Sequence, residues 1–415
     1  MKAEIISIGT ELLTGQTINT NTAFLGEELQ ELGIDLRYQS CVQDSIKDIQ
    51  EVLSIALNRA ELIITTGGLG PTSDDLTHKA IFSFFNLNPI LDKTVLKDIQ
   101  TKFKLKGYRK MPKINLKQAY KPKNAKWIRN KLGTANGIIW KINKEQSKLI
   151  LTFPGVPREM QQMWSDSIKP YLNNLSKNSF YSRTLKYTGI GESALAEKIN
   201  QYFYLKNPIV APYASIGEVK IKVTGSAKTK DQAKRIAMKT TDKILRKTKE
   251  YFFGFNNETL EGLTADKLVK FKKTIAIAES CTGGLLSKRL TDIPGSSNYI
   301  KLNVITYSNE AKNKLLKIPN EILKKYGAVS PQVAALMAKN IKQLADTDFG
   351  ISITGIAGPG GGSKAKSVGL VYFGFAKGNN IKIKKMQFGQ NSTRDEIRFL
   401  ATQFALNWLR KELYK

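Results

Sequence analysis

Short apolar runs alternate with longer amphipathic stretches along most of this chain. The runs at 3–8, 61–66 and 274–278 are rich in Ile, Leu and Ala, and each leads into a turn that contains glycine or serine. Runs of this length indicate buried strands, whereas the stretches at 20–32 and 283–290 have the spacing of helices. Strands that alternate with helices predict an α/β fold with a doubly wound sheet, in which ligands bind at the carboxyl ends of the strands.

The length of 415 residues exceeds what one hydrophobic core usually serves, because a domain typically has about 100–200 residues. We predict an α/β domain at 1–170, a small α+β connecting domain at 171–255 and a second α/β domain at 256–415. In the middle block, 218–224 alternates like a half-buried strand. The stretch 252–258 is interpreted as the linker to the last domain.

The string AESCTGG, which follows the run at 274–278, places a hydroxyl nucleophile at a strand-to-helix turn. Its nucleophile is Ser280, and Gly283 and Gly284 let a substrate approach the backbone closely. At a helix N-terminus, unpaired N–H groups and the helix dipole favour an anion. A serine hydroxyl also needs a base, and the only histidine, His78, lies about two hundred residues away in another block. A Ser-His-Asp triad is therefore not expected.

Lysine is the remaining candidate for the base, provided that burial or a cationic neighbour lowers its pKa. Lys312 follows the strand-like run 299–307, on a helix opened at Ser308 or the next residue. We therefore expect it at the same sheet edge as Ser280. Tyr307, at the end of that run, could relay a proton or hold the oxyanion. Taken singly, the serine is better explained as a helix cap and the lysine as a solvated surface residue.

Two later strings complete the candidate site. The glycine-rich loop TGIAGPGGG begins at Thr354 and Gly355, and the string NSTR ends at Arg394. The loop is a candidate phosphate cradle, and the arginine can bind an anion. Thr393 opens a capping box, which explains that residue without a further role. An acyl-transfer site for a phosphorylated substrate needs groups of these kinds, namely a serine, a lysine, a tyrosine, a glycine cradle and an arginine. Because all of them occur in one block, a shared site is favoured over a separate structural explanation for each residue.

The last of the three blocks resembles the C-terminal domain of the CinA family, which is a nicotinamide mononucleotide (NMN) deamidase with a Ser-Lys-type nucleophile. The strings ESCTGG, YSNEAK, TGIAGPGGG and STR have close counterparts there, in the same order and at similar spacing. The resemblance implies that Ser280 is the nucleophile, Lys312 its base and Tyr307 an assisting hydroxyl. It also implies that Thr354 and Arg394 contact the substrate, beside the turn and loop glycines, and that the deamidase needs no cofactor.

The front block carries a second candidate site. The run at 61–66 leads into the string TGGLGPTSDD. Asp74 and Asp75 could hold a hard divalent cation such as Mg²⁺ against a bound phosphate, although an acidic pair that opens a helix is also ordinary dipole complementarity. The residues that could wrap the phosphate are Gly67, Gly68, Gly70 and Thr72.

Residues 1–170 resemble the MoaB/MogA-like molybdopterin-binding domain at the front of CinA proteins. The matching strings are GTELL, NTN, TGGLGPTSDD and FPGVPREM. In the family this domain is associated with metal-dependent ADP-ribose pyrophosphatase activity. The resemblance therefore implies ADP-ribose as a substrate and Mg²⁺ or another divalent cation as the cofactor of this domain, and it is no evidence of a role in molybdenum metabolism.

Charge alters this interpretation little. The formal net charge is +30, and the blocks 1–170, 171–255 and 256–415 carry +7, +10 and +13. Positive charge is thus spread over the chain, which favours attraction of anionic nucleotides over binding to DNA, and nucleic acid is not expected as a partner. From 99 to 144 there are 14 Lys and Arg and no acidic residue, and we interpret this stretch as a solvated face or loop.

Two cysteines that lie far apart, Cys41 and Cys281, cannot frame a disulfide scaffold, and no Cys/His cluster has zinc-binding spacing. Nothing resembles a signal peptide or an 18-residue apolar span, so we expect a cytoplasmic protein without a membrane partner. Cys281 could be proposed as a thiol nucleophile, but a position in the first turn of a helix better suits a small packed residue.

We therefore predict a cytoplasmic hydrolase of pyridine nucleotide salvage. It would convert NMN and water to nicotinate mononucleotide and ammonia through an acyl-enzyme at Ser280, and it would act as a homodimer on small-molecule nucleotides. Two alternatives stay open: a binding protein tied to DNA uptake or damage without deamidase activity, and a protein in which only the front domain is active.

Overall fold

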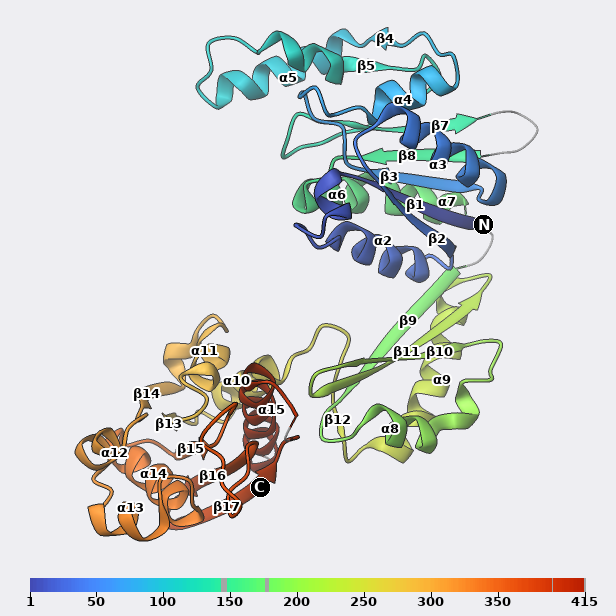
Figure 1. Ribbon diagram of the computed structural model, residues 1–415. Coiled ribbons are helices and arrows are strands. Elements are labelled where there is room, and N and C mark those ends of the chain that lie inside the picture. Colours follow the sequence, from blue (N-terminus) through green and yellow to red (C-terminus); the bar gives the residue numbers. More distant parts are fainter. Residues whose placement is uncertain (143–147, 176–178, 390, 414–415) are drawn as a thin grey trace. The chain divides into compact units, whose positions relative to one another are not determined.

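The computed structural model describes residues 1–142, 148–175, 179–389 and 391–413 (Figure 1). Three sheets of four or more strands organise the chain, and helices accompany each of them. By its internal contacts the chain divides into two units, Met1–Tyr181 with Gly225–Arg235, and Ser182–Thr224 with Ile236–Lys415. No helix in these described ranges is long and apolar enough to cross a membrane.

The first domain is built on a six-stranded sheet. Its strands are β1 (Lys2–Ile8), β2 (Asp35–Val42), β3 (Leu62–Thr66), β6 (Lys126–Ile128), β7 (Gly137–Ile142) and β8 (Lys148–Phe153). The order is β2-β1-β3-β8-β7-β6, in which the first four strands pair in parallel and the last two pair antiparallel. Every residue of β3 is buried, as expected for a strand covered on both faces.

Helices cover both faces of this sheet. They are α1 (Thr10–Leu13), α2 (Thr20–Glu31), α3 (Ile46–Arg59), α4 (Thr77–Phe84), α6 (Pro157–Met163) and α7 (Lys169–Leu175). One hydrophobic cluster includes Leu25 of α2 and Trp164, and the other includes Leu53 of α3 and Ile81 of α4. The amphipathic stretch at 20–32 is confirmed as α2. The predicted α/β fold with two covered sheet faces is therefore confirmed for this domain.

A smaller layer lies beside α4 (Figure 1). It consists of β4 (Ile90–Leu91), α5 (Lys93–Leu105), the 3₁₀-helix η1 (Lys113–Ala119) and β5 (Tyr120–Lys121). The strands β4 and β5 pair antiparallel. Much of the basic stretch 99–144 belongs to this layer, and some of its lysines form polar contacts with other residues of the domain. Lys102 forms an ion pair with Asp98, and Lys117 donates to the carbonyl oxygen of Asp75. Part of the basic stretch is therefore packed structure.

The middle domain has a four-stranded sheet with the order β10-β11-β9-β12. Its elements are β9 (Ser179–Tyr187), α8 (Glu192–Ile199), the 3₁₀-helix η3 (Asn200–Tyr202), β10 (Ile209–Ser215), β11 (Glu218–Ala227), α9 (Lys230–Thr248) and β12 (Phe252–Phe255). The strand expected at 218–224 is confirmed as part of β11. The linker interpretation of 252–258 is wrong for its first half, because β12 pairs with β9 and the side chain of Phe253 is buried.

The last domain has a five-stranded sheet with the order β14-β13-β15-β16-β17. Its strands are β13 (Ile275–Glu279), β14 (Ile300–Ile305), β15 (Phe349–Gly355), β16 (Leu370–Lys377) and β17 (Asn380–Gln387). β13 pairs in parallel with β14 and β15, whereas β16 runs antiparallel to both of its neighbours. The carboxyl ends of β13, β14 and β15 therefore meet at one edge, where the candidate site was expected.

Helices also cover both faces of this last sheet. They are α10 (Leu260–Lys270), α11 (Leu285–Thr291), α12 (Asn309–Leu316), α13 (Asn320–Tyr326), α14 (Pro331–Leu344) and α15 (Arg394–Glu412). One cluster joins α10, α11 and α15 to the sheet, with Leu268, Leu286 and Leu406 among its buried residues. The other joins α12, α13 and α14, with Leu316 and Met337. Because the helices cover only the two faces, turns and loops form the carboxyl edge of the sheet.

Candidate functional site

Ser280 lies in a tight turn directly after the buried strand β13. Its backbone N–H donates to the carbonyl oxygen of Ile353 on the neighbouring strand at 3.0 Å, and 8% of the residue is exposed. The helix predicted at 283–290 begins later, at Leu285, because Gly283 and Gly284 adopt left-handed conformations with φ of 59° and 90°. Only glycine adopts such a pair at little cost, so these glycines shape the turn that carries Ser280.

Glu279, which the sequence analysis did not single out, fixes this turn. Its carboxylate is fully buried and accepts hydrogen bonds from the N–H groups of Gly284, Leu286 and Ser287 at 3.1, 3.1 and 2.8 Å. The hydroxyl of Ser287 donates to it as well, at 2.6 Å. The expectation that the first turn of this helix offers free N–H groups to an anion is therefore wrong, because the protein's own carboxylate binds them.

Lys312 reaches Ser280 from α12. The hydroxyl of Ser308 caps this helix by accepting the N–H of Ala311 at 3.1 Å, which confirms the predicted helix start. The lysine is 1% exposed, and its Nζ lies 3.1 Å from Ser280 Oγ. Nζ also donates to the carbonyl oxygen of Thr306 at 2.7 Å. The nucleophile and the base expected from the sequence are thus brought together.

The surroundings of Lys312 favour a neutral amine. Burial lowers the pKa of Lys312 to about 8, from an ordinary value of 10.5. Among the residues that the structure describes, the hydrogen-bond partners of Nζ are two backbone carbonyls, of Thr306 and Tyr307, and the hydroxyl of Ser280, and none is a carboxylate. A neutral amine has two N–H donors and one lone pair, so it can satisfy both carbonyls and accept the serine proton. The arrangement suits a general base.

Tyr307 and Arg394 face each other near the ends of β14 and α15. One guanidinium nitrogen of Arg394 donates to the Tyr307 hydroxyl at 2.7 Å, and another donates to the carbonyl oxygen of Gly358 at 2.7 Å. Arg394 thereby ties the glycine-rich loop to Tyr307, whose side chain is 60% exposed. The predicted capping box of Thr393 and Glu396 is confirmed at the start of α15. The tyrosine hydroxyl has no hydrogen bond to the serine, so its assisting role stays a prediction.

Thr354 and Gly355 lie at the end of β15. Thr354 is fully buried, and its hydroxyl donates to the carbonyl oxygen of Ala328 at 2.9 Å. A Cβ at Gly355 would lie 2.7 Å from the carbonyl oxygen of Leu370, so a glycine is required there for strand packing. Both residues therefore have structural roles, and their contact with a substrate stays a prediction.

Arg398 and Cys281 are two further neighbours of Ser280. Arg398, on α15, donates twice to the carbonyl oxygen of Thr282, at 3.2 and 3.0 Å, and so holds the turn from outside. Its sequence position, more than a hundred residues from the turn, gave no sign of this role. Cys281 is 6% exposed, and burial raises the pKa of its thiol to about 12. A thiol that stays protonated is a poor nucleophile, which favours Ser280.

The front loop follows β3 and is held by close packing. Gly67 and Gly68 have φ of 101° and 64°, and a Cβ at Gly67 would lie 2.0 Å from the carbonyl oxygen of Ile8. The hydroxyl of Thr77, at the start of α4, donates to the carbonyl oxygen of Gly67 at 2.7 Å. The predicted cradle glycines therefore occupy conformations and spaces that other residues would not tolerate.

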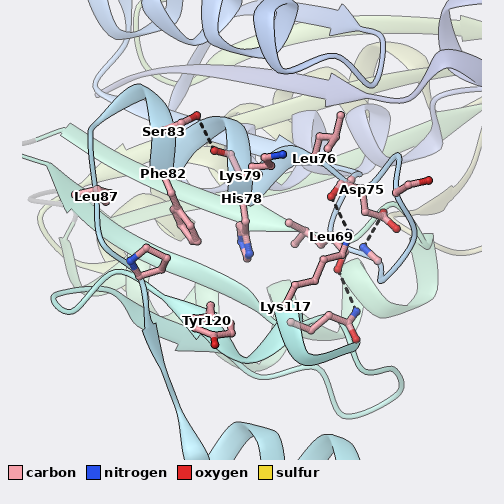
Figure 2. A pocket seen from close by; sticks show the side chains of 15 residues that line it. Leu69, Asp75, Leu76, His78, Lys79, Phe82, Ser83, Leu87, Lys117 and Tyr120 are labelled. Carbon is pink, nitrogen blue, oxygen red and sulfur yellow. Dashed lines mark hydrogen bonds between the residues drawn. The ribbon is translucent and has the colours of Figure 1, made fainter. Parts of the chain in front are cut away.

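The two aspartates of this loop differ in their surroundings. The carboxylate of Asp75 accepts the N–H groups of Gly70 and Thr72, at 2.7 and 2.9 Å, and the hydroxyl of Thr72. These hydrogen bonds hold the loop from Gly70 to Asp75 in a tight turn around the carboxylate (Figure 2). Asp74 is exposed. Within the described residues, no group of three or more His, Cys, Asp or Glu is arranged to hold a metal ion, so a metal role of the pair stays a prediction.

A polar cavity of about 400 Å³ lies over this loop. Its walls include both aspartates and three further carboxylates, which are Glu11, Asp44 and Glu159. Some of these already have partners: Asp44 accepts the N–H of Thr10 at 3.0 Å, and Glu159 accepts the side-chain amide of Asn130 at 2.6 Å. The cavity is thus acidic and lies at the carboxyl ends of the parallel strands, but its carboxylates do not converge on one point.

Together, the folds and the Ser280–Lys312 pair define a three-domain α/β protein with a serine–lysine site in its last domain. Sequence profiles match each domain: the CinA C-terminal domain matches residues 257–413, a probable molybdopterin binding domain matches 4–174, and the damage-inducible protein CinA KH domain matches 182–254. The chain belongs to the CinA family.

Full-length relatives support this assignment. A CinA-like protein of Crocosphaera subtropica is 45% identical over 417 aligned residues, which cover 100% of both chains. A putative competence-damage inducible protein of Caldicellulosiruptor bescii is 42% identical over 414 residues, covering 100% of this chain and 99% of that one. One solved structure matches part of the chain, namely the crystal structure of the protein CinA with unknown function from Thermoplasma acidophilum. The sequence identity is 32% and the TM-score is 0.38, and the match covers 41% of this chain and 96% of that one.

Proposed function

We propose that the last domain is an amidohydrolase that converts NMN and water to nicotinate mononucleotide and ammonia. The observation that carries this proposal is the buried pair of Ser280 and Lys312, with Oγ and Nζ 3.1 Å apart. NMN as the substrate is what the resemblance to the CinA C-terminal domain implies. A guanidinium at Arg394 beside the glycine-rich loop is consistent with a phosphorylated substrate.

In the proposed reaction, neutral Lys312 accepts the proton of Ser280 while Oγ attacks the amide carbon. The N–H groups of Cys281 and Thr282 are candidate donors to the oxyanion, because neither donates to an oxygen within the described residues. The lysine, now an ammonium, then protonates the nitrogen of the tetrahedral intermediate, and the C–N bond breaks to give ammonia and the acyl-enzyme. Lys312 next takes a proton from a water molecule that attacks the ester, and it returns this proton to Oγ as the ester C–O bond breaks, which releases nicotinate mononucleotide and the serine.

Ammonia release from NMN by the full chain tests this proposal. Ser280→Ala should abolish it, whereas Cys281→Ala, which changes the neighbouring residue, should leave it near the wild-type rate. Hydroxylamine added during turnover should trap the acyl group as a hydroxamate in the wild-type protein. Unchanged ammonia release in Ser280→Ala would exclude the serine as the nucleophile.

A second activity is proposed for the first domain, namely hydrolysis of the pyrophosphate bond of ADP-ribose with a divalent cation. Its support is the acidic cavity over the glycine loop, together with the family resemblance. Carboxylate oxygens are suitable ligands for Mg²⁺, and of the two aspartates in the loop Asp74 is the exposed one. The bound cation would neutralise phosphate charge. The chain's own contribution would be to shape the cavity and to hold the phosphates with the N–H groups of Gly68 and Leu69, because those of Gly67 and Gly70 already donate to Phe153 and Asp75.

Nucleic-acid binding is the rival function, and the KH-like middle domain with its net charge of +10 is the observation in its favour. KH domains hold nucleic acid with a GXXG loop. The sequence from 182 to 254 contains no GXXG string. We therefore keep small nucleotides as the proposed ligands. A salt titration of DNA binding tests this, because binding through many phosphates should be measurable at low salt and weaken steeply as salt rises. We also expect a homodimer, which sedimentation of the full chain would test.

A further inference from the structure

The turn between β10 and β11 of the middle domain packs against α15 of the last domain. The segment Ser182–Thr224, which contains this turn, and the whole last domain belong to the same compact unit of the chain. The turn includes Gly217, whose φ is 71°. A Cβ on this glycine would lie 3.1 Å from Leu400 Cδ2 and 3.2 Å from Gln403 Cγ, both on the helix. The backbone conformation and the close approach to α15 therefore both favour glycine here.

Gln403 joins this turn to the interior of the last domain. The residue is 4% exposed, and its Nε2 donates to the carbonyl oxygen of Gly217 at 3.3 Å. The same carbonyl oxygen accepts the hydroxyl of Thr188 at 2.9 Å, which fixes the turn from the side of the middle domain. The Oε1 of Gln403 accepts a hydrogen bond from Arg289 at 2.6 Å. One side-chain amide thus bridges the middle domain and an arginine of the last domain.

Arg289 fastens α11 to two neighbouring helices. It lies in the second turn of α11 and is 8% exposed. Its guanidinium donates to the carboxylate of Glu261 on α10, and to Thr402 at 2.8 Å and Gln403 at 2.6 Å on α15. Its Cζ also lies 4.8 Å from the centroid of the Phe399 ring. A planar guanidinium with several fixed donors suits such a contact among three helices.

The two helices α11 and α15 also hold the turn of Ser280. α11 begins at Leu285, directly after the glycines of this turn. α15 carries Arg398, which donates twice to the carbonyl oxygen of Thr282 inside the turn. Close-packed interiors transmit displacements from one element to the next. A shift of α11 relative to α15 would therefore move the turn that carries the serine hydroxyl.

α15 has a second contact with the middle domain. The guanidinium of Arg410 donates to the carbonyl oxygen of Phe252 on β12 at 3.4 Å. Gln403 and Arg410 are about two helical turns apart, so they lie on one face of the helix. Contacts at two points along that face fix both the position and the rotation of α15 on the middle domain.

We propose that the middle domain is a positioning element of the Ser280 site and that it acts through Gln403 and Arg289. The proposal rests on the acyl-transfer function proposed for the last domain, and it does not depend on which amide is the substrate. When the turn at Gly217 is seated on α15, the amide of Gln403 is fixed and presents its oxygen to Arg289, which holds α11. Within the described residues none of the three is hydrogen-bonded to Ser280 or Lys312, so they are positioning residues.

Gln403→Glu separates the two contacts of this amide. A carboxylate can still accept from Arg289, but it has no donor for the carbonyl oxygen of Gly217. We expect kcat for ammonia release from NMN to fall about threefold to thirtyfold, with KM changed by less than about twofold, because a misplaced nucleophile affects the chemical step more than binding. Gln343→Glu, the same change at an exposed position of α14, is the matched control and should keep the wild-type kcat.

Gly217→Asn tests the contact from the other side. Asparagine tolerates the left-handed conformation, but its side chain would meet α15 and push the turn away from the helix. Gly189→Asn is the matched control, because Gly189 has φ of 77° and open space where a Cβ would lie. Gly217→Asn should lower kcat about as much as Gln403→Glu does, and the double variant should lose little more than either alone, because both changes break one contact.

Thermal unfolding shows which of these variants are folded, and either folded variant suffices for the test. A folded Gln403→Glu or Gly217→Asn protein with the wild-type kcat would overturn the proposal. A double variant in which the two losses multiply would overturn it as well, because the two residues would then act independently.

A fluorophosphonate without a nucleotide group separates this proposal from the proposed substrate, since such a reagent phosphonylates an activated serine with loss of fluoride. If Ser280 of the wild type is labelled and both variants react about threefold to thirtyfold more slowly, the positioning role stands even where NMN is not deamidated and the proposed substrate fails. If NMN is deamidated and both variants keep the wild-type kcat and labelling rate, the positioning role fails and the proposed function stands.

Discussion

The two candidate sites lie at the carboxyl ends of similar sheets and differ in how closely their reactive groups are gathered. In the last domain Ser280 and Lys312 are almost completely buried, and their reactive atoms are 3.1 Å apart. In the first domain the carboxylates around the glycine loop share a cavity and do not converge. An amine and a hydroxyl attract each other through a hydrogen bond, whereas carboxylates repel one another until a cation joins them. Folding alone can therefore assemble the first kind of site, and the second kind also needs its cation.

The two sites have one structural feature in common. In each, a carboxylate next to the glycine turn accepts several of its N–H groups: Glu279 holds the turn of Ser280, and Asp75 holds the loop from Gly70 to Thr72. Charge-assisted hydrogen bonds of this kind are stronger than neutral ones. These two carboxylates therefore position their turns, and we propose the reactive roles for their neighbours.

The sharpest test of the preassembled site is Lys312→Met. We expect ammonia release from NMN to fall about 10³-fold or more, because nucleophile and base act as a unit. From pH 10 to pH 7 the stability of the variant relative to the wild type should rise by about 1–3 kcal/mol, because the lowered pKa of Lys312 means that the fold opposes its protonation. The carbonyls of Thr306 and Tyr307 lose a donor in the variant, and this cost is the same at both pH values. The unfolded chain binds this proton more tightly, so the gain should be complete below pH 8 and should vanish as the pH rises toward 10.5.

Thermal unfolding of Lys312→Met and of the wild type at pH 7 and pH 10, with ammonia release at pH 7, measures both effects. Lys314→Met, which changes a lysine on the same helix away from the serine, is the matched control and should alter neither quantity much. A variant whose stability relative to the wild type is the same at pH 7 and pH 10 would contradict the interpretation of Lys312 as a buried base.

The next comparison separates the two aspartates of the front loop. Asp74→Asn should lower Mg²⁺-dependent ADP-ribose hydrolysis by about 10²-fold and leave stability nearly unchanged, because this residue is exposed. Asp75→Asn should lower stability by about 1–3 kcal/mol, because an amide cannot accept all the hydrogen bonds of the carboxylate. Denaturant unfolding and the hydrolysis assay, with NMN deamidation as the internal control, test this division of roles. The reverse pattern would make Asp75 the metal ligand.

Glu279→Gln tests the positioning role in the last domain. The amide would place an N–H₂ group against the N–H donors of Gly284, Leu286 or Ser287, so the turn should shift. We expect kcat to fall about tenfold to a hundredfold with a smaller change of KM, because a misplaced nucleophile affects the chemical step more than binding. Glu310→Gln, on the exposed side of α12, is the control. A change confined to stability would assign Glu279 a purely structural role.

The sequence predicted the strands and the motifs better than the tertiary contacts that hold the motifs in place. β13, β14 and the capped start of α12 follow from apolar runs and from Ser308, because these signals are local. Glu279 was missed because its partners are backbone N–H groups, which the sequence does not distinguish. Arg398 was missed because it reaches the turn from a helix more than a hundred residues later. Contacts of both kinds depend on tertiary packing, and no short pattern reports them.

The linker interpretation failed for a similar reason. Residues 252–255 were interpreted as part of a linker, yet their pairing with β9 gives them a place in a sheet. A run of four residues is too short for a clear strand period, so long-range pairing decides this case.

The smallest expected effect is the pH dependence of the proposed deamidation. Because the base must be neutral and burial places the pKa of Lys312 at about 8, roughly a tenth of the free enzyme has the active form at pH 7. The kcat/KM for NMN should therefore rise about fivefold from pH 7 to pH 8 and level off near pH 9. Cys281, with its pKa raised to about 12, cannot cause a rise in this window, so Cys281→Ala should show the same profile. A flat profile between pH 6 and pH 9 would mean that proton transfer to Lys312 does not limit the reaction, and the contrast between the two sites would then rest on geometry alone.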